Sequence, residues 1–442
     1  MFRQLDLKNF KNFRDVTLKL GGLTVLVGTN AAGKSNLRDA FRFVHGMSHG
    51  FSLAEIIGGK WAEGSPQWKG IRGGTKEAAF CGNSDFTVST SLSGLPADCW
   101  HSITVDVGTG KETPVVSKES LRADKTTMCY STHLEGQVEQ KGRNFRFVRL
   151  PRGGNNRKEG KKLQFSASQP ILTQISELAF HQYLTAQAAA GTQNSESDAT
   201  AYSRLSLANT ALQSMVVQLS LKAMRFLDLV PDAMRLPSLP GQDNLGDRGE
   251  NLSSVLLAIC GDKTKKAAIL EWVRQLTPLD VHDFDFVSDQ TGKILVTLVE
   301  SGGQRTSAYS ASDGTLRFLA MIAALFGPKP AKFYFFEEID NGIHPTRLHL
   351  LLQLIEQRVK DAGIQVVATT HSPQLLGFLS KESREFASVV YRLEGEKEGR
   401  ICRIMDIPDA KKVLESQNLG RLHESGWLEN AVAFMGTKGN KE

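Results

Sequence analysis

The sequence predicts an α/β fold in which buried strands alternate with helices to build a mostly parallel sheet. Three short runs are rich in β-branched or aromatic residues and suit buried strands: Leu23–Val27, Phe333–Phe336 and Gln365–Thr370. A segment with helical spacing of apolar residues follows the first run, and another separates the second from the third. This alternation is typical of a parallel sheet covered by helices.

Length and composition agree with a globular protein of several domains. The chain has 442 residues, of which 40% are apolar and 23% charged. At about 100–200 residues per domain this length allows two or three domains. We expect an ATPase lobe at 1–170, a helical insertion at 171–290, a second ATPase lobe at 291–405 and a C-terminal tail at 406–442. The run Leu316–Phe326 is too short for a membrane span, which needs about 20 apolar residues, so no membrane partner is expected.

The N-terminal third reads as strands followed by a helix and a β-region. The strand Leu23–Val27 stops at Gly28, and Asn36–Val44 has apolar residues at 37, 40, 41 and 44, the pattern of a helix. From Gly46 to about Ser168, glycine-rich turns separate short alternating stretches. These predict an antiparallel β-region.

The remainder divides into a helical middle and a second strand-and-helix stretch. Helices are expected at 171–190, 204–229, 252–259, 266–275, 316–325 and 347–359, with a polar break at 191–200 and a loop at 231–248. Strands are expected at 293–299, 333–336, 365–370, 389–393 and 401–405. No stretch sustains the heptads of a coiled-coil arm.

The net positive charge of the chain comes from one short segment. Lys141–Lys162 contains nine basic residues and one acidic residue, whereas the whole chain has a net charge of +6. Phosphate binding to DNA or RNA, contact with an acidic protein, and a solvated hairpin tip all remain open for this segment.

A phosphate-binding loop follows the first buried strand. Gly28-Thr-Asn-Ala-Ala-Gly-Lys-Ser35 matches G-x-x-x-x-G-K-[ST] in full, between a predicted strand and a predicted helix. Its backbone N–H groups and the following helix N-terminus suit phosphate. Lys34 would reach the β- and γ-phosphates and Ser35 would ligate Mg²⁺. The residues expected to contact the nucleotide here are Gly28, Asn30, Ala31, Ala32, Gly33, Lys34, Ser35 and Asn36.

Polar residues follow the two later strands. Phe333–Phe336 ends in Glu337 and Glu338, and paired carboxylates at a strand end are costly unless a cation lies between them. We expect Glu337 near Mg²⁺ and Glu338 as the base that orients and deprotonates the attacking water. His371 follows Gln365–Thr370 and is expected to donate to the γ-phosphate.

These three motifs, in this order, resemble the ATP-binding cassette ATPases of the RecF, SMC and OLD type. The resemblance covers Met1–Val44 and Ser310–Leu379 well and the middle weakly. It implies an ABC-ATPase head with a short helical insertion and no long coiled coil. In such ATPases a signature sequence contacts ATP held by a second subunit. The stretch 310–317 looks like this signature, and it would place Ser312, Asp313 and Gly314 at the nucleotide.

Other parts of the resemblance are less complete. Asp340-Asn341-Gly342 is similar to the family's D-loop. Glu337 stands where many of these ATPases have Asp, and Asp313-Gly-Thr315 replaces Gly-Gly-Gln. For the Mg²⁺-binding glutamine of the Q-loop both Gln169 and Gln174 remain candidates, with Gln169 assigned as the metal ligand.

The resemblance implies an ATPase that uses ATP and Mg²⁺ and forms a homodimer, or a higher even-numbered oligomer, around two ATP molecules. Bacterial ATPases of this build resemble the ATPase subunits of the Septu and PARIS anti-phage systems. A switch that gates a separate nuclease or toxin is therefore expected. The alternatives are a RecF-like ATPase of DNA repair or maintenance that acts directly on DNA, and a non-catalytic scaffold that binds ATP only for assembly. Since 71 residues follow His371, we expect no nuclease domain of the Toprim type.

Cysteine usage and the N-terminus point to a reducing compartment. Five cysteines at wide spacing argue against a disulfide framework. Cys99 and His101 with Cys129 and His133 are a weak candidate for a zinc site, because no pair has the usual cysteine spacing. Met1–Leu20 lacks the apolar block of a signal peptide, and we expect a cytoplasmic protein.

Overall fold

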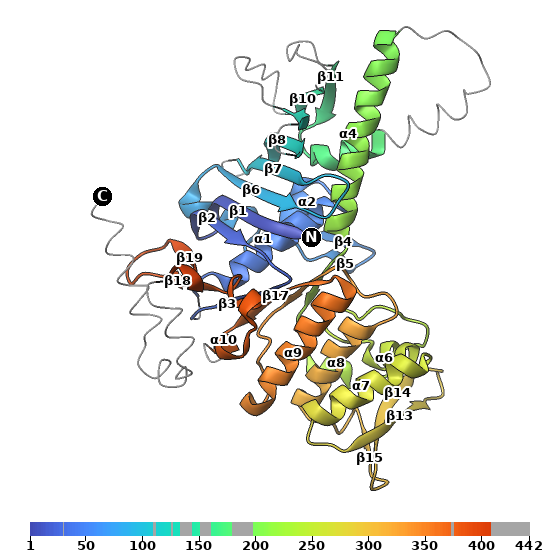
Figure 1. Ribbon diagram of the computed structural model, residues 1–442. Coiled ribbons are helices and arrows are strands. Elements are labelled where there is room, and N and C mark those ends of the chain that lie inside the picture. Colours follow the sequence, from blue (N-terminus) through green and yellow to red (C-terminus); the bar gives the residue numbers. More distant parts are fainter. Residues whose placement is uncertain are drawn as a thin grey trace, which may run out of the picture. The chain divides into compact units, whose positions relative to one another are not determined.

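The structure is a computed structural model that describes residues 1–29, 31–108, 112–124, 127–132, 144–150, 161–178, 198–372 and 375–407 (Figure 1). The chain divides into two compact units. The first comprises residues 1–20, 32–223 and 392–401, and the second comprises residues 21–31, 224–391 and 402 onwards. The predicted domains follow one another along the sequence, whereas each of these units combines separated stretches of chain.

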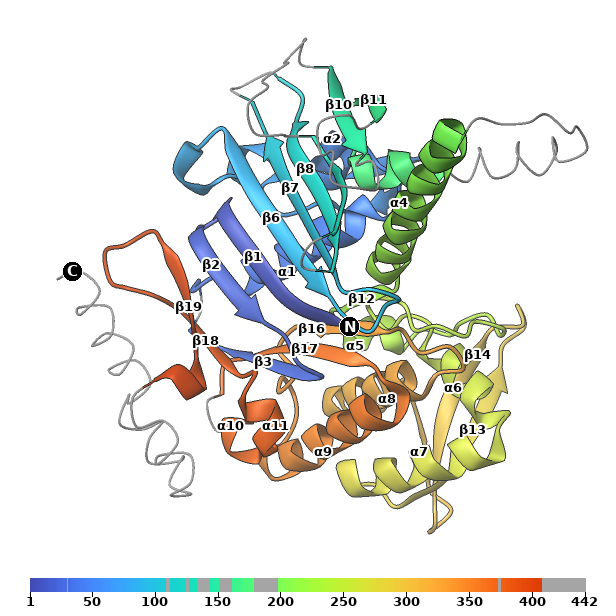
Figure 2. The ribbon, with the colours of Figure 1, turned by 45° about the horizontal axis from the view of Figure 1, so that its top comes forward.

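An eight-stranded antiparallel sheet forms the centre of the first unit, in the order β11-β10-β9-β8-β7-β6-β1-β2 (Figure 2). Along β6 and β7 buried residues alternate with partly exposed ones, so one face of the sheet lies on the core and the other is polar. The antiparallel β-region predicted from the sequence is confirmed. The strands are β1 (Phe2–Phe10), β2 (Phe13–Lys19), β6 (Asp85–Leu92), β7 (Cys99–Asp106), β8 (Val115–Ala123), β9 (Thr127–Ser131), β10 (Phe145–Leu150) and β11 (Lys161–Ser166).

Helices and short elements complete the first unit. Helix α1 (Lys34–Met47) buries the apolar side chains that predicted it, and α2 (Leu53–Gly58) begins with a capping box made by Ser52 and Glu55. Residues 171–178 are helical. The remaining elements are the hairpin β4 (Lys60–Ala62) and β5 (Ser65–Trp68), the 3₁₀ turns η1 (Gly74–Glu77) and η2 (Phe80–Gly82), and helix α4 (Asp198–Lys222).

Helix α4 differs from the prediction at both ends. It begins at Asp198, inside the predicted break at 191–200, of which residues 191–197 lie outside the described part of the chain. The predicted helix at 204–229 was wrong beyond residue 222, because Met224–Leu227 form strand β12. This strand pairs in parallel with residues 333–336. Sheet pairing and burial therefore override the helical pattern there.

A six-stranded sheet forms the centre of the second unit, in the order β12-β16-β17-β3-β18-β19. The pairs β12–β16, β16–β17, β17–β3 and β3–β18 are parallel, as the sequence predicted. Every residue of β3, β16 and β17 is buried, which explains their continuous apolar runs. The strands are β3 (Leu23–Val27), β16 (Phe333–Phe336), β17 (Gln365–Thr370), β18 (Ser388–Arg392) and β19 (Gly399–Arg403).

Helices and a small antiparallel sheet surround the core of the second unit. Arg358 on α9 donates from Nε and Nη2 to the carbonyl oxygen of Leu325 at 3.1 and 3.0 Å, which ties the end of α8 to α9. The elements are α5 (Pro231–Met234), α6 (Leu252–Cys260), α7 (Lys263–Leu276), α8 (Asp313–Phe326), α9 (Pro345–Ala362), α10 (Leu375–Phe378), α11 (Lys381–Arg384), β13 (Val281–Ser288), β14 (Ile294–Glu300), β15 (Arg305–Ser307) and η3 (Ile404–Asp406).

The predicted absence of a long coiled coil is confirmed for the described residues, where the longest helix is α4 with 25 residues. Among the residues that the structure describes, none of the helices is long and apolar enough to span a membrane.

Candidate nucleotide site

The phosphate loop joins strand β3 to helix α1, as its motif predicts. A Cβ atom on Gly28 would lie 2.1 Å from the carbonyl oxygen of Val390, so only glycine fits there. Gly33 has φ +124°, a conformation that favours glycine. Its carbonyl accepts from the amides of Asn36 and Leu37, which starts α1. Lys34 is 7% exposed and begins this helix. Asn30 lies outside the described residues.

A polar network in the first unit supports the end of the loop. Asn12 donates from Nδ2 to the carbonyl of Ala32 at 3.1 Å and accepts at Oδ1 from Asn36 Nδ2 at 2.7 Å. Asn36 in turn accepts at its own Oδ1 from Arg72 Nη2 at 3.3 Å. Asn36, predicted to bind nucleotide, therefore also braces the loop through Asn12 and Arg72.

The same arginine reaches helix α1 through a buried carboxylate. Arg72 Nε donates to Asp39 Oδ2 at 3.0 Å, and Lys11 Nζ lies 3.5 Å from that oxygen. Burial lowers the pKa of Lys11, although Asp39 opposes the shift. Sequence reasoning missed Asn12, Arg72 and Lys11 because they belong to turns without a motif.

The paired acids and the histidine lie at one edge of the parallel sheet in the second unit. Strands β16, β17 and β3 are adjacent and parallel, with Thr370 opposite Val27 in register. Their carboxyl ends therefore meet where Gly28, Glu337 and His371 follow. The structure thus brings together the acids, the histidine and the start of the loop.

Glu338 has an unusual backbone conformation. Its φ is +50°, which costs a non-glycine residue roughly 1–2 kcal/mol. The conformation is held by its own N–H, which donates to Thr369 Oγ1 at 2.9 Å. The side chain is 48% exposed, with Oε1 3.4 Å from Nε2 of His371. Asn341 Nδ2 donates to the other carboxylate oxygen at 3.3 Å. Backbone strain next to a histidine at the carboxyl edge of a parallel sheet is compatible with a functional position.

The signature loop lies at the N-terminus of α8. The side chain of Ser312 caps this helix by accepting from the amide of Thr315 at 3.2 Å. Ser312 and Asp313 are exposed. A Cβ atom on Gly314 would lie 2.3 Å from the carbonyl oxygen of Gly342, which itself has φ +76°. The D-loop that follows Glu338 therefore packs directly on the signature of its own chain.

Of the two Q-loop candidates, Gln174 is engaged locally. Its amide accepts from the N–H of Ser166 at 2.9 Å and donates to the carbonyls of Ser166 and Gln169 at 2.9 and 3.0 Å. Gln169 makes one longer bond, to the carbonyl of Gly50 at 3.3 Å. These contacts favour Gln169 as the residue that is able to turn toward a metal.

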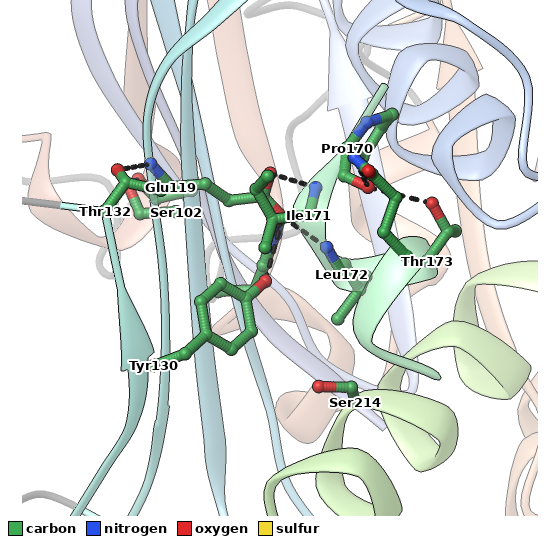
Figure 3. A network of polar contacts seen from close by, with 12 residues as sticks. Ser102, Glu119, Tyr130, Thr132, Pro170, Ile171, Leu172, Thr173 and Ser214 are labelled. Carbon is green, nitrogen blue, oxygen red and sulfur yellow. Dashed lines mark hydrogen bonds and ion pairs between the residues drawn. The ribbon is translucent and has the colours of Figure 1, made fainter. Parts of the chain in front are cut away.

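A buried carboxylate anchors the helix that follows Gln169 (Figure 3). Glu119 on β8 accepts from the amides of Ile171 and Leu172 at 2.7 and 2.9 Å. It also accepts from Tyr130 Oη at 2.8 Å and contacts His101 Nε2 at 2.9 Å. Negative charge at a helix N-terminus is stabilising, so this network fixes where the helix after Gln169 begins.

The chemistry of the donors suits Mg²⁺ better than zinc. Within the described ranges no three His, Cys, Asp or Glu side chains gather into a metal site. The zinc candidate is thus unsupported for Cys99, His101 and Cys129, and His133 lies outside those ranges. A phosphate-loop Mg²⁺ needs instead hydroxyl, carboxylate, water and phosphate oxygens, which Ser35 and Glu337 suit.

The basic segment is only partly described. Its residues 141–143 and 151–160 lie outside the described part of the chain. The flanking strands β10 and β11 pair antiparallel, with Arg149 opposite Lys162 in register. Both strands belong to the antiparallel β-region that the sequence predicted.

Comparison with known families adds an independent observation. Residues 176–377 match a family model described as "AAA domain, putative AbiEii toxin, Type IV TA system". The matched stretch includes the signature loop, the paired acids and His371. This stretch of the chain is similar to an ATPase-family domain. At that level, the predicted resemblance to ATPases of the RecF, SMC and OLD type is confirmed.

Individual relatives match the chain over short stretches. A 76-residue stretch is 33% identical to a protein of Helicobacter pylori (strain ATCC 700392 / 26695) named ATP/GTP phosphatase, covering 16% of this chain and 20% of that protein. A 60-residue stretch is 42% identical to the chromosome partition protein Smc of Clostridium kluyveri, covering 13% of this chain and 5% of that protein. The chain therefore matches a fifth or less of these relatives' lengths.

Solved structures of SMC heads are similar to the chain over most of its length. One is an SMC head bound to the C-terminal winged-helix domain of ScpA, with a TM-score of 0.45 and 14% identity over 91% of this chain and 97% of that one. Another is the SMC head of Thermotoga maritima, with a TM-score of 0.39 and 10% identity over 91% and 98% of the two chains.

Proposed function

We propose that this ATPase-family domain hydrolyses ATP as a switch that dimerises around the nucleotide and gates a partner effector, a nuclease or toxin, in bacterial anti-phage defence. The observation that carries the hydrolytic part is Glu338, which the fold holds at φ +50° beside His371 at the carboxyl edge of the sheet. A strained, half-exposed acid next to a histidine at this edge supports a functional role for Glu338.

The chemistry assigns each residue one task. Lys34 and the loop amides would bind the β- and γ-phosphates, and Ser35, Glu337 and Gln169 are the residues that would hold Mg²⁺, which neutralises phosphate charge when bound. Glu338 accepts a proton from water as the water oxygen attacks the γ-phosphorus. The bond between that phosphorus and the β–γ bridging oxygen breaks, which yields ADP and phosphate. His371 donates to the γ-phosphate and contacts Glu338, so it senses whether this phosphate is present.

The scheme needs a second copy because, in the ATPases that the motifs resemble, the signature contacts ATP held by another subunit. Ser312 and Asp313 are exposed at a helix N-terminus, which suits an anionic ligand. Their neighbour Tyr309 is 72% exposed, a large exposed fraction for an aromatic side chain. An exposed aromatic beside a phosphate-binding turn supports contact with another chain.

The effector is inferred from family. The matched family model is described as a putative toxin of a type IV toxin–antitoxin system, which supports a link to such a system. The separate effector rests on the resemblance to the ATPase subunits of anti-phage systems. Copurification of the ATPase with the product of a neighbouring gene, followed by an assay of that product with and without ATP, tests this part. An effector whose activity ignores nucleotide would overturn the gating proposal. DNA binding that falls steeply with salt and needs Lys141–Lys162 would instead support the repair alternative.

Hydrolysis is tested with one isosteric change and a matched control. Glu338→Gln should lower multiple-turnover phosphate release by about tenfold or more while ATP binding is retained, because the amide cannot accept the proton. Glu394→Gln removes an exposed glutamate outside the site and should leave turnover unchanged. Equal turnover in both variants would remove Glu338 from the chemistry.

A further inference from the structure

Arg235, which belongs to no motif, donates hydrogen bonds to the signature loop on either side of Ser312. Arg235 follows the short helix α5 in the second unit and is 22% exposed. Its Nη2 donates to the carbonyl oxygen of Ala311 at 3.1 Å and to Asp313 Oδ1 at 2.7 Å. Its Nη1 donates to Asp232 Oδ1 at 2.9 Å. The guanidinium therefore joins the residue before Ser312 to the residue after it.

This contact has two consequences for the loop. Because a guanidinium is planar and rigid, two acceptors on one nitrogen fix the path of the backbone through Ser312. The loop is also braced from the other side, since Gly314 packs against the carbonyl oxygen of Gly342. Ser312 is thus held between the arginine and the D-loop.

The contact also changes the charge of the loop. Asp313 is an exposed carboxylate in the first turn of α8, beside the residues that are proposed to meet a γ-phosphate. A carboxylate there would repel phosphate unless a cation neutralised it. Arg235 supplies that cation, because a guanidinium is always charged in proteins, and its hydrogen bond to Asp313 raises the pKa of Arg235 further.

We propose that Arg235 is a positioning residue of the signature loop, which neutralises Asp313 and holds Ser312 and Gly314 ready for the γ-phosphate of ATP bound by a second copy of the chain. This inference rests on the proposed function, in which two copies enclose ATP. Arg235 then serves the nucleotide of the partner and makes no contribution to binding ATP by its own phosphate loop.

The test measures ATP binding by the monomer and ATP-dependent dimerisation separately. It uses Glu338→Gln protein, which is expected to bind ATP without hydrolysing it. Glu338→Gln protein is titrated with a fluorescent ATP analogue at concentrations where it is monomeric, and its ATP-dependent dimerisation is measured by analytical ultracentrifugation. Adding Arg235→Ala should leave the monomer's nucleotide affinity within about twofold. The same change should weaken dimerisation by about tenfold or more, because the unpaired Asp313 then opposes phosphate.

A second change makes the result specific to charge. Asp313→Asn combined with Arg235→Ala should recover part of the lost dimerisation, since the repelling carboxylate is gone. A purely structural role for Arg235 would give no such recovery. The matched control is Arg403→Ala, which breaks another surface arginine pair, with Asp406 at 2.6 Å, and should leave dimerisation unchanged.

Three results would overturn the proposal. They are unchanged dimerisation in Arg235→Ala, a monomer whose nucleotide affinity falls together with dimerisation, and no recovery on Asp313→Asn. Failure of the proposed function has a different appearance, because the Glu338→Gln parent would then show no ATP-dependent dimer at all. Circular dichroism melting of each variant verifies that it is folded.

Discussion

The backbone strain at Glu338 predicts that replacing this acid by glycine leaves the protein about as stable as before while it abolishes hydrolysis. A non-glycine residue in the left-handed region costs roughly 1–2 kcal/mol, and Glu338 has φ +50°. Glycine removes that cost. Because glycine loses more conformational entropy on folding, however, the same change also destabilises the fold by about 0.5–1 kcal/mol. The contacts of the half-exposed carboxylate with His371 and Asn341 are worth about 0–1 kcal/mol. Glu338→Gly should therefore change the free energy of unfolding by about −1 to +1.5 kcal/mol, which is close to no change at the middle of these ranges.

A glutamate with the same backbone conformation provides the control. Glu63 also has φ +50° and is exposed in the β4–β5 turn. Glu63→Gly should raise the free energy of unfolding by about 0.5–1 kcal/mol with turnover unchanged. Glu338→Gln keeps the strain and should lose turnover without this gain. Urea unfolding followed by tryptophan fluorescence, with phosphate release measured on the same samples, gives both quantities.

The reasoning would be refuted if Glu338→Gly lost more than about 1 kcal/mol of stability while Glu63→Gly gained it. Glu338 would then be held by contacts that stabilise the fold, and its conformation would not be a cost carried for function.

Four further expectations follow from particular contacts. Gly28→Ala places Cβ 2.1 Å from the carbonyl of Val390 and should abolish nucleotide binding in a fluorescent-ATP titration, while binding that survives would show the loop to be pliable. Gly314→Ala places Cβ 2.3 Å from the carbonyl of Gly342, and such overpacking costs about 1–3 kcal/mol, so steady-state turnover should fall with monomer ATP affinity retained. Glu119→Gln replaces one carboxylate oxygen, which accepts hydrogen bonds, by an NH₂ group, which donates them, although four donors surround this side chain. The free energy of unfolding measured in urea should therefore fall by about 1–3 kcal/mol, and an unchanged value would show that the network relaxes. Burial raises the pKa of the Cys99, Cys129 and Cys260 thiols to about 11, so at pH 8 each holds about a hundredth of the thiolate of a thiol with pKa 9, and mass-mapped alkylation should label the exposed Cys81 first.

The sequence predicted most accurately where local pattern and tertiary environment agree. Strands β3, β16 and β17 are buried on both faces, so their apolar runs were unambiguous and fixed the edge at which the loop, the acids and His371 follow. The region β12 shows the opposite case. Met224–Leu227 continues a helical pattern, but pairing with β16 determines its structure, and such a long-range partner is invisible in a single sequence.

Residues that support the site were also beyond sequence reasoning. Arg235 precedes Asp313 by 78 positions and bonds to it only because α5 and α8 pack together. Asn12 and Arg72 meet Asn36 across 24 and 36 positions in the first unit. Motifs record residues that touch a ligand, because their spacing reflects local geometry. Residues that position those motifs follow from packing, which spacing does not encode. The strain at Glu338 is likewise a property of the backbone that composition does not reveal.

The central claim is that two copies enclose ATP, each lending its signature loop to the nucleotide of the other. Native mass spectrometry of Glu338→Gln protein with ATP and Mg²⁺ tests it most directly. If two copies enclose ATP, the spectrum should show a particle of two chains and two ATP molecules, and this particle should disappear when ADP replaces ATP. A single chain with one ATP, or a dimer that forms equally well without nucleotide, would contradict it.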